Sequence, residues 1–287
     1  RINLPTENTL QFGNSVASMV EEKINDDSIL WLGTYSGLVR MNLSSGKSIR
    51  FMKKETDPFS LVSNQINQVI KDNSGVIWIA TENGLSYISP KAIKFNNLFD
   101  EKIGLEALES LKNSNVLSIS QHPDKTLFFG TTNGLHTLIS SPTNRKIQKY
   151  NSTEGLNVWS IASGSSDDLL IGTYGQGLKQ LNFSTGSLKN WIIESPTFKT
   201  SAFNYIKSLY LEENILWMGC WGGGLAKFNT NNGEYKIWIS RTDDPNSISY
   251  NDVWAITRDR KGRLWIATNG GGLNLAYRQA GLFDDSD

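Results

Sequence analysis

Six aromatic residues lie in short turns or at the beginnings of apolar segments, where their faces could bind a ligand. The turns contain Tyr35, Tyr174 and Trp221, and the segment starts contain Trp159, Tyr205 and Trp254. Aromatic faces suit sugar rings, which present flat C–H surfaces, and an aromatic side chain loses little entropy when it is ordered. Amide side chains that could bind hydroxyl groups are close by in the sequence: Asn157, Gln176, Asn204, Asn251 and Asn269. We predict a ligand site formed by Tyr35, Trp159, Tyr174, Trp221, Trp254 and Asn269.

Residue types that carry common catalytic chemistry are few and badly spaced. The only histidines, His122 and His136, have no Cys or carboxylate at ligand spacing, so no metal site is expected. The single cysteine, Cys220, has no histidine near it in the sequence to activate it as a nucleophile. Glycine runs at 222–224 and 270–272 precede strand patterns, whereas a phosphate-binding loop opens a helix. We therefore expect no catalytic residue, no metal and no cofactor.

Acidic residues are numerous, but most of them lie in segments that we predict to be turns and linkers. The clearest are Asp26, Asp27, Asp167, Asp168, Asp243, Asp244 and Asp259. A glycosidase needs two carboxylates held at a fixed separation across the scissile bond. Turn chemistry accounts for these acids without such a pair, because Asp side chains hydrogen-bond nearby backbone groups.

A short motif that must position these residues is repeated six times. An apolar anchor at 31, 78, 128, 170, 217 and 265 is followed by Gly-Thr, Ala-Thr or Gly-Cys and then by Gly-Leu, at steps of 47, 50, 42, 47 and 48. The glycine of Gly-Leu comes six residues after the anchor in the first three copies and seven after it in the last three. We therefore predict that the turn before Gly-Leu is one residue longer in the last three repeats. Self-similarity at such a period is typical of a repeat architecture.

Each repeat is predicted to form four antiparallel strands. It begins with two apolar residues three apart, such as Ile66 and Val69, and we expect them on opposite faces of a strand buried on both faces. The anchor strand, a strand opening at Gly-Leu, and an alternating outer strand follow. Four strands per repeat of 40–50 residues are typical of a β-propeller blade, so we predict an all-β propeller with six repeat units.

The predicted units are 14–63, 64–113, 114–155, 156–203, 204–250 and 251–287, forming one domain over 1–287. Residues 1–13 are predicted to end a preceding blade or to supply a ring-closing strand. The Trp anchors (Trp31, Trp78, Trp217 and Trp265) are expected to pack between blades. A short helical turn is possible at 105–111.

Composition excludes several classes of partner. Lys+Arg and Asp+Glu both number 28, so the formal net charge is zero. This balance argues against nucleic-acid binding and against a basic membrane-binding patch. No apolar run reaches the length of a membrane span. One cysteine forms no intrachain disulfide, so the fold does not depend on an oxidising compartment.

Two features resemble the two-component-regulator propeller repeat. One is the anchor motif, seen in Leu-Trp-Ile-Ala-Thr at 264–268; the other is the linker Asp-Pro-Asn-Ser-Ile-Ser at 244–249, matched at 57–62 by Asp-Pro-Phe-Ser-Leu-Val. The resemblance extends over about residues 14–277. Units three and four depart from it, with Phe128 and Leu170 at the anchor. Family propellers usually have seven blades, so a seven-bladed ring in the intact protein is the alternative to six.

The resemblance implies a sensor fragment of a membrane-bound hybrid histidine kinase of the Bacteroidetes type. Such receptors have two propellers, a β-sandwich, one membrane span and a cytoplasmic kinase. The implied location is periplasmic, the implied ligand an oligosaccharide from polysaccharide breakdown, and the implied output control of glycan-utilisation genes. The adjoining propeller and β-sandwich, and a second receptor copy in a homodimer, are the implied protein partners. The membrane would be reached only through other parts of the receptor.

Strand order assigns the predicted ligand residues to one end of the blades. The turn after each anchor strand and the linkers to the next blade lie at the same end, and loops on a rigid scaffold are where binding residues concentrate. Units four to six hold most of these aromatics. Three alternatives stay open: aromatics that only fill the channel mouth or pack on linkers, a propeller enzyme (a polysaccharide lyase or glycosidase), and a structural or dimerising propeller. Fold alone does not separate them.

Overall fold

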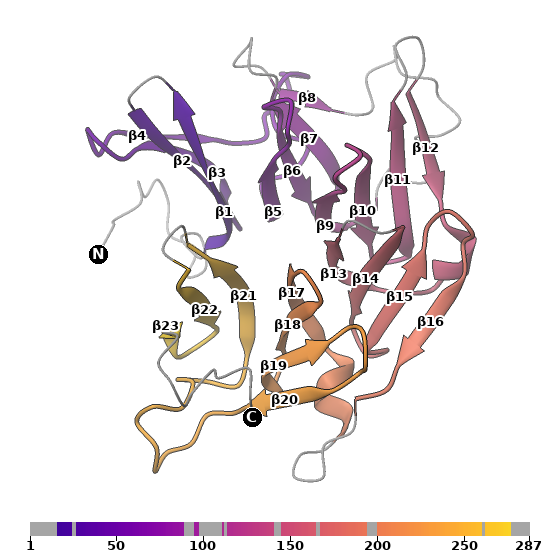
Figure 1. The fold of residues 1–287 in the computed structure, drawn as a ribbon. Helices are drawn as coiled ribbons and strands as arrows, with labels where there is room; N and C mark the ends of the chain where they lie inside the picture. The colour runs from indigo at the N-terminus through magenta and orange to yellow at the C-terminus, as the bar shows by residue number, and fades with distance from the viewer. Residues whose placement is uncertain are drawn as a thin grey trace. The chain divides into compact units, whose positions relative to one another are not determined.

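The computed structural model describes residues 16–24, 27–88, 95–97, 111, 114–140, 145–164, 167–193, 200–259 and 262–276. It is an all-β structure whose strands form six antiparallel sheets, as the repeat predicts (Figure 1). The chain divides into two compact units, residues 1–155 and 156–287. This division falls on the predicted boundary between the third and fourth repeats. The possible helical turn at 105–111 lies outside the described residues except for the buried Leu111, and residues 1–13 lie outside them altogether.

The first unit contains three four-stranded sheets, each running in chain order from its inner strand outward. The first sheet is β1 (Val16–Ile24), β2 (Asp27–Thr34), β3 (Gly37–Asn42) and β4 (Ser48–Phe51). The second is β5 (Ile66–Lys71), β6 (Ile77–Thr81), β7 (Gly84–Ile88) and β8 (Phe95–Asn97). The third is β9 (Val116–Gln121), β10 (Leu127–Thr131), β11 (Gly134–Ser140) and β12 (Arg145–Lys149), followed by the 3-10 turn η2 (Asn151–Thr153).

The second unit repeats this plan. Its first sheet is β13 (Val158–Ser163), β14 (Asp168–Thr173), β15 (Leu178–Asn182) and β16 (Leu188–Trp191). After the 3-10 turn η3 (Thr200–Asn204), the next sheet is β17 (Ile206–Glu212), β18 (Ile215–Cys220), β19 (Gly224–Asn229) and β20 (Tyr235–Trp238). In the last sheet the described strands are β21 (Val253–Arg258), β22 (Leu264–Thr268) and β23 (Gly272–Ala276).

The prediction that the paired apolar residues of each inner strand lie on opposite faces is wrong. In β5, Ile66 pairs with Thr81 and Val69 with Ile79. These partners are two residues apart in β6, so the side chains of Ile66 and Val69 lie on the same face of the sheet. The cause is a β-bulge between Ile66 and Gln68, which adds one residue to the strand and so shifts the alternation by one position. The same irregularity occurs near the start of all six described inner strands.

The anchor tryptophans are mostly buried, and acids in the preceding turns bind two of them. Trp31, Trp78 and Trp217 are buried, while Trp265 is half-buried. The Trp78 indole N–H donates to the Asp72 carboxylate at 2.8 Å, and the Trp265 indole N–H donates to Asp259 at 2.9 Å. These acids therefore fix the anchors as well as the turns.

The small residue two places after each anchor makes room for the neighbouring sheet. A Cβ on Gly33 would lie 2.6 Å from Ile66 Cγ2 on the next inner strand, and one on Gly219 would lie 2.7 Å from Val253 Cγ1. The apolar pair of one inner strand therefore packs into the space left by this glycine on the adjacent sheet. Such close packing leaves no room for a side chain at these two glycines, and the second and sixth repeats have only the small residue Ala, at 80 and 267, in this position.

The two linkers that resemble each other in sequence also fold alike. In the first, the Ser60 hydroxyl accepts a hydrogen bond from Lys54 N–H and donates to the Asp57 carbonyl. In the second, Ser247 makes the same two bonds with Arg241 and Asp244. The apolar residues that follow, Leu61 and Ile248, are buried in the cores of their units.

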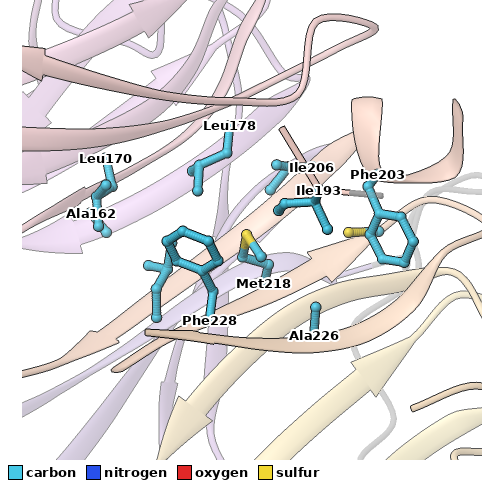
Figure 2. Packing of buried hydrophobic residues seen from close by; sticks show 11 residues of the cluster. Ala162, Leu170, Leu178, Ile193, Phe203, Ile206, Met218, Ala226 and Phe228 are labelled. Carbon is cyan, nitrogen blue, oxygen red and sulfur yellow. The ribbon is translucent and has the colours of Figure 1, made fainter. Parts of the chain in front are cut away.

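Hydrophobic clusters fill the spaces between adjacent sheets within each unit. Figure 2 shows the cluster between the first two sheets of the second unit, where Phe228, Met218, Ile206 and Phe203 pack together. Its members come from β13–β19 and from the segments beside them. This packing holds the ends of β13 and β17 close together, and that is where the candidate site lies.

Candidate functional site

The turn after each anchor strand is bonded to the start of its own inner strand. The first residue of the turn donates its backbone N–H to the carbonyl just before the inner strand in five repeats: Glu82 to Gln65, Thr132 to Asn115, Tyr174 to Asn157, Trp221 to Tyr205 and Asn269 to Asp252. A second bond reaches the following sheet, as when Gly224 donates to the Asn251 carbonyl at 2.9 Å. These bonds bring side chains from the turns and from the inner-strand starts to one end of each sheet.

The bulge in each inner strand provides the second set of side chains. The bulged residue has no partner in the next strand. The residues directly before and after it pair with two consecutive residues of β14, β18 or β22. In the second unit these residues are Trp159, Lys207 and Trp254. In the first unit they are Ala17, Asn67 and Leu117. Tryptophan and lysine therefore occupy this position only in the second unit.

Four rings of the second unit form a continuous cluster, which we call the aromatic cluster: Trp159, Tyr174, Tyr205 and Trp221. Trp159 stacks on Trp221 with ring centroids 5.7 Å apart and an interplanar angle of 21°. Tyr174 lies 4.6 Å from Trp159 and meets Tyr205 edge-on at 4.8 Å. Two adjacent sheets thus contribute equally to one surface.

The aromatic cluster is open to solvent. Trp221 is 47% exposed and Tyr174 is 41% exposed, whereas Trp159 and Tyr205 are half-buried. Exposed apolar area that is contiguous, as opposed to scattered, is a feature of binding surfaces. The stacked and edge-on contacts hold the rings in place, so little side-chain entropy remains to be lost when a ligand binds.

The side chain of Lys207 lies against this cluster. The Lys207 Nζ atom is 4.8 Å from the Trp159 ring centroid and 5.6 Å from that of Trp254. Burial lowers the pKa of Lys207 below its ordinary value. The half-buried Trp254 is thereby connected to the aromatic cluster through the lysine.

The structure brings together four of the six residues predicted from the sequence. Trp159, Tyr174 and Trp221 are in the aromatic cluster, and Trp254 is linked to it by Lys207. Asn269 is exposed on the last sheet and occupies the turn position that Tyr174 and Trp221 occupy on theirs. Tyr35 is in the first unit, half-buried, and burial raises its pKa. Their role in ligand binding stays a prediction.

Of the neighbouring amide side chains, that of Asn251 bonds to the backbone. The Asn251 side-chain oxygen accepts a hydrogen bond from Ser240 N–H at 2.7 Å. At Asn204 it is the backbone carbonyl, and not the side chain, that accepts from Gly175 N–H at 2.7 Å and from Gly177 N–H at 3.1 Å. The buried Asn157 Oδ1 atom has no hydrogen-bond partner within the described part of the chain. It lies one residue before β13, at the base of the aromatic cluster.

Lys207 was not among the predicted residues, and Tyr205 was noted only as an aromatic at a segment start. A signal for Lys207 is present in the sequence, because it follows Ile206 just as Trp159 follows Val158 and Trp254 follows Val253. Aligning the repeats on the first apolar residue of the inner strand would have placed these three side chains at one position.

The remaining candidates for chemistry are the single cysteine and the residue types that bind metals. The Cys220 thiol is fully buried, and burial raises its pKa to about 12, so the thiolate needed for nucleophilic attack is suppressed. Within the described ranges, no three His, Cys, Asp or Glu side chains are grouped as metal ligands. None of the helices in this described part has both the length and the hydropathy to cross a bilayer.

Comparison with known proteins identifies the repeat. The model of the two-component regulator propeller family matches residues 60–83 and 247–270, which begin at the two equivalent linker serines. A protein named histidine kinase P4, from Formosa agariphila, is 26% identical over 192 residues, which cover 65% of this chain and 13% of that protein.

Solved structures share the fold. The extracellular domain assigned to the hybrid two-component system BT3049 of B. thetaiotaomicron matches with a TM-score of 0.71 and 20% identity, over 93% of this chain and 34% of that one. Virginiamycin B lyase from Staphylococcus aureus matches with a TM-score of 0.61 and 14% identity, over 96% and 88%. These similarities show a β-propeller fold. The chain spans about a third of the receptor domain and a smaller part of the kinase.

Proposed function

We propose that this chain, which carries two-component regulator propeller repeats, is an extracytoplasmic sensor propeller of a hybrid two-component histidine kinase, located in the periplasm. The similarity to the extracellular domain of a two-component system and to a histidine kinase supports this function. The chain covers only part of each relative, so the kinase, the adjoining propeller and β-sandwich, and receptor dimerisation belong to this proposal.

The exposed aromatic cluster is the single observation that supports direct ligand binding. Its two most exposed rings, Trp221 and Tyr174, present apolar faces that sugar rings could cover. The proposed ligands are oligosaccharides released from polysaccharides, and the proposed output is control of glycan-utilisation genes. Binding would favour one arrangement of the receptor, and signalling would follow from the difference in ligand affinity between the two arrangements.

The proposal is tested by a thermal-shift screen of this chain against plant, animal and microbial oligosaccharides, with calorimetry on each hit. We expect at least one saccharide to raise the Tm, because a ligand that binds only the folded state stabilises it. Trp221→Ala should abolish the shift without altering the fold measured by circular dichroism. Tyr235→Ala is the matched control, because Tyr235 is a 38% exposed aromatic on the outer strand β20.

Two outcomes would contradict direct binding. If no saccharide stabilises a folded sample, this propeller does not bind the ligand, and a structural or dimerising role replaces the proposal. If Trp221→Ala and Tyr235→Ala weaken binding equally, the aromatic cluster is not the site. Release of a shortened or unsaturated saccharide during the assay would instead indicate a propeller enzyme.

A further inference from the structure

Lys207 is placed by the backbone between two tryptophan rings at the proposed site. It is the bulged residue of β17, as Trp159 is of β13 and Trp254 of β21. Its Nζ atom is 4.8 Å from one ring centroid and 5.6 Å from the other. A half-buried ammonium therefore lies against Trp159, one of the four rings of the aromatic cluster.

The positive charge of Lys207 is not neutralised by any described residue. No hydrogen bond or ion pair joins its Nζ atom to an oxygen in the part of the chain that the structure describes, and burial lowers its pKa. Other lysines do have such partners: Lys149 is 3.2 Å from Glu154, and Lys71 is 3.4 Å from Glu22. Removing a cation from water is costly unless an anion accompanies it, and ring faces compensate only in part.

A purely structural cation–π contact is the simplest alternative, and this chain contains one for comparison. The exposed Lys189 places its Nζ atom 3.4 Å from the ring centroid of Trp191, on the outer strand β16. Solvent can satisfy the three N–H donors of that lysine. Lys207 differs because it is half-buried and because its ring partner Trp159 stacks on Trp221, the most exposed ring of the aromatic cluster.

We propose that the saccharide bound by the aromatic cluster carries an anionic group, a carboxylate or a sulfate, that pairs with Lys207 Nζ. This inference rests on the proposed function. The uncharged faces of Trp221 and Tyr174 would cover the sugar ring, while the anion accepts hydrogen bonds from the ammonium. Both kinds of anion offer the same chemistry, oxygen acceptors bearing negative charge, and charge-assisted bonds to them are stronger than neutral ones.

The test compares acidic saccharides with neutral forms of the same chain. The probes are a galacturonic acid oligosaccharide and its methyl ester, and a sulfated galactan oligosaccharide and its desulfated form. We expect one of the acidic probes to bind in calorimetry and its neutral form to bind at least about 10-fold more weakly, as for loss of a charged hydrogen bond. The two pairs distinguish a carboxylate from a sulfate. Added salt should weaken the acidic probe selectively.

Variants assign the effect to the lysine. Lys207→Met should reduce affinity for the acidic probe at least about 10-fold and leave the weak binding of its neutral form unchanged. Lys207→Arg, which retains the charge, should keep most of the preference. Lys189→Met removes the exposed lysine–tryptophan contact and should change neither affinity. Circular dichroism and the unliganded Tm verify that each variant folds.

The other outcomes overturn the inference in distinguishable ways. Equal binding of acidic and neutral forms, unaffected by Lys207→Met, rejects the anionic ligand but keeps a saccharide sensor. An acidic preference that persists in Lys207→Met rejects the role of Lys207. Failure of all four probes and of the wider oligosaccharide screen to bind a folded sample rejects the proposed function together with this inference.

Discussion

Trp159, Lys207 and Trp254 owe their common position to one extra residue in each inner strand. A bulge leaves its extra residue without a partner in the ladder, and so re-aims that side chain. The repeat needs the bulge for packing, because it puts both apolar residues of the strand on one face. The bulged residue itself is free to vary, from Ala17 in the first sheet to Lys207 in the fifth. The side chain at this position can therefore change without disturbing the core.

His136 shows how a buried residue makes stability depend on pH. Its side chain is 1% exposed, and neither ring nitrogen has a hydrogen-bond partner among the described residues. Burial, with a smaller effect of the charge on Lys149, lowers its pKa from 6.5 to about 4. Between these values the unfolded chain binds a proton that the folded chain does not, so the free energy of unfolding decreases as pH falls from 6.5 towards about 4.

We expect this loss to reach roughly 3 kcal/mol and to level off below the folded pKa. It is measured by urea unfolding at several pH values. His136→Leu removes the titrating group, and its unfolding free energy should fall less over the same pH range. Comparing the two proteins cancels the contribution of the carboxylates. If both lose equal stability between pH 6.5 and about 4, the buried imidazole is not responsible.

At the scale of the element, the hairpin between the second and third strands is the most constrained part of each repeat. The threonine that ends the second strand closes the hairpin, as when the Thr34 hydroxyl donates to the Gly37 carbonyl at 2.7 Å. Cys220 has this position in the fifth sheet, which explains an isolated buried thiol without a chemical role. The hairpin turns are residues 35–36, 82–83 and 132–133 in the first unit, and 174–177, 221–223 and 269–271 in the second. The longer turns predicted for the last three repeats are confirmed.

Two glycines of one hairpin can be substituted to measure separately how much stability is lost through backbone strain and how much through a steric clash. Gly222 and Gly224 have φ angles of 74° and 80°, but a Cβ on Gly224 would lie 2.2 Å from the Trp238 carbonyl oxygen, while one on Gly222 would meet nothing within 4 Å. We expect Gly222→Ala to cost about 1 kcal/mol and Gly224→Ala about 2–5 kcal/mol in urea unfolding. Equal costs would mean that the outer strand moves aside, and that the contact does not explain the glycine.

At the scale of the whole molecule, the charge balance affects association between molecules more than it affects the fold. The 28 basic and 28 acidic residues give no net charge at pH 7, and the isoelectric point is about 7.0. A chain without net charge lacks the repulsion that keeps molecules apart. Any electrostatic contribution to binding must then come from local arrangements of charge, such as the one proposed around Lys207.

We expect light scattering at a fixed protein concentration to be higher at pH 7 than at about pH 9, where the chain is negatively charged. Salt at about 0.15 M should reduce the difference, because it screens the repulsion at the higher pH. Scattering that is independent of pH, or lower at pH 7, would show that association is controlled by apolar surface instead.

The sequence by itself determined the architecture of this protein. Six anchors at nearly constant steps predicted six sheets, and the residues around each anchor predicted the hairpin turns. These features could be read because they are local: glycine tolerates positive φ, and a tryptophan beside alternating apolar residues must be buried. The same periodicity placed Trp159, Tyr174 and Trp221 at one end of their sheets. Their division between two adjacent sheets was also visible in the repeat numbering.

The tertiary structure decided what the local pattern could not show. Bulges shifted the alternation in every described inner strand, so the paired residues that were expected on opposite faces share one face. The same bulges placed Lys207 beside two tryptophans, whereas the ligand site predicted from the sequence consists of aromatic and amide side chains. A bulge has no strong residue signal, because it is fixed by the packing of one sheet against the next and not by the propensity of the bulged residue. Contacts across sheets therefore decided the chemistry of the candidate site.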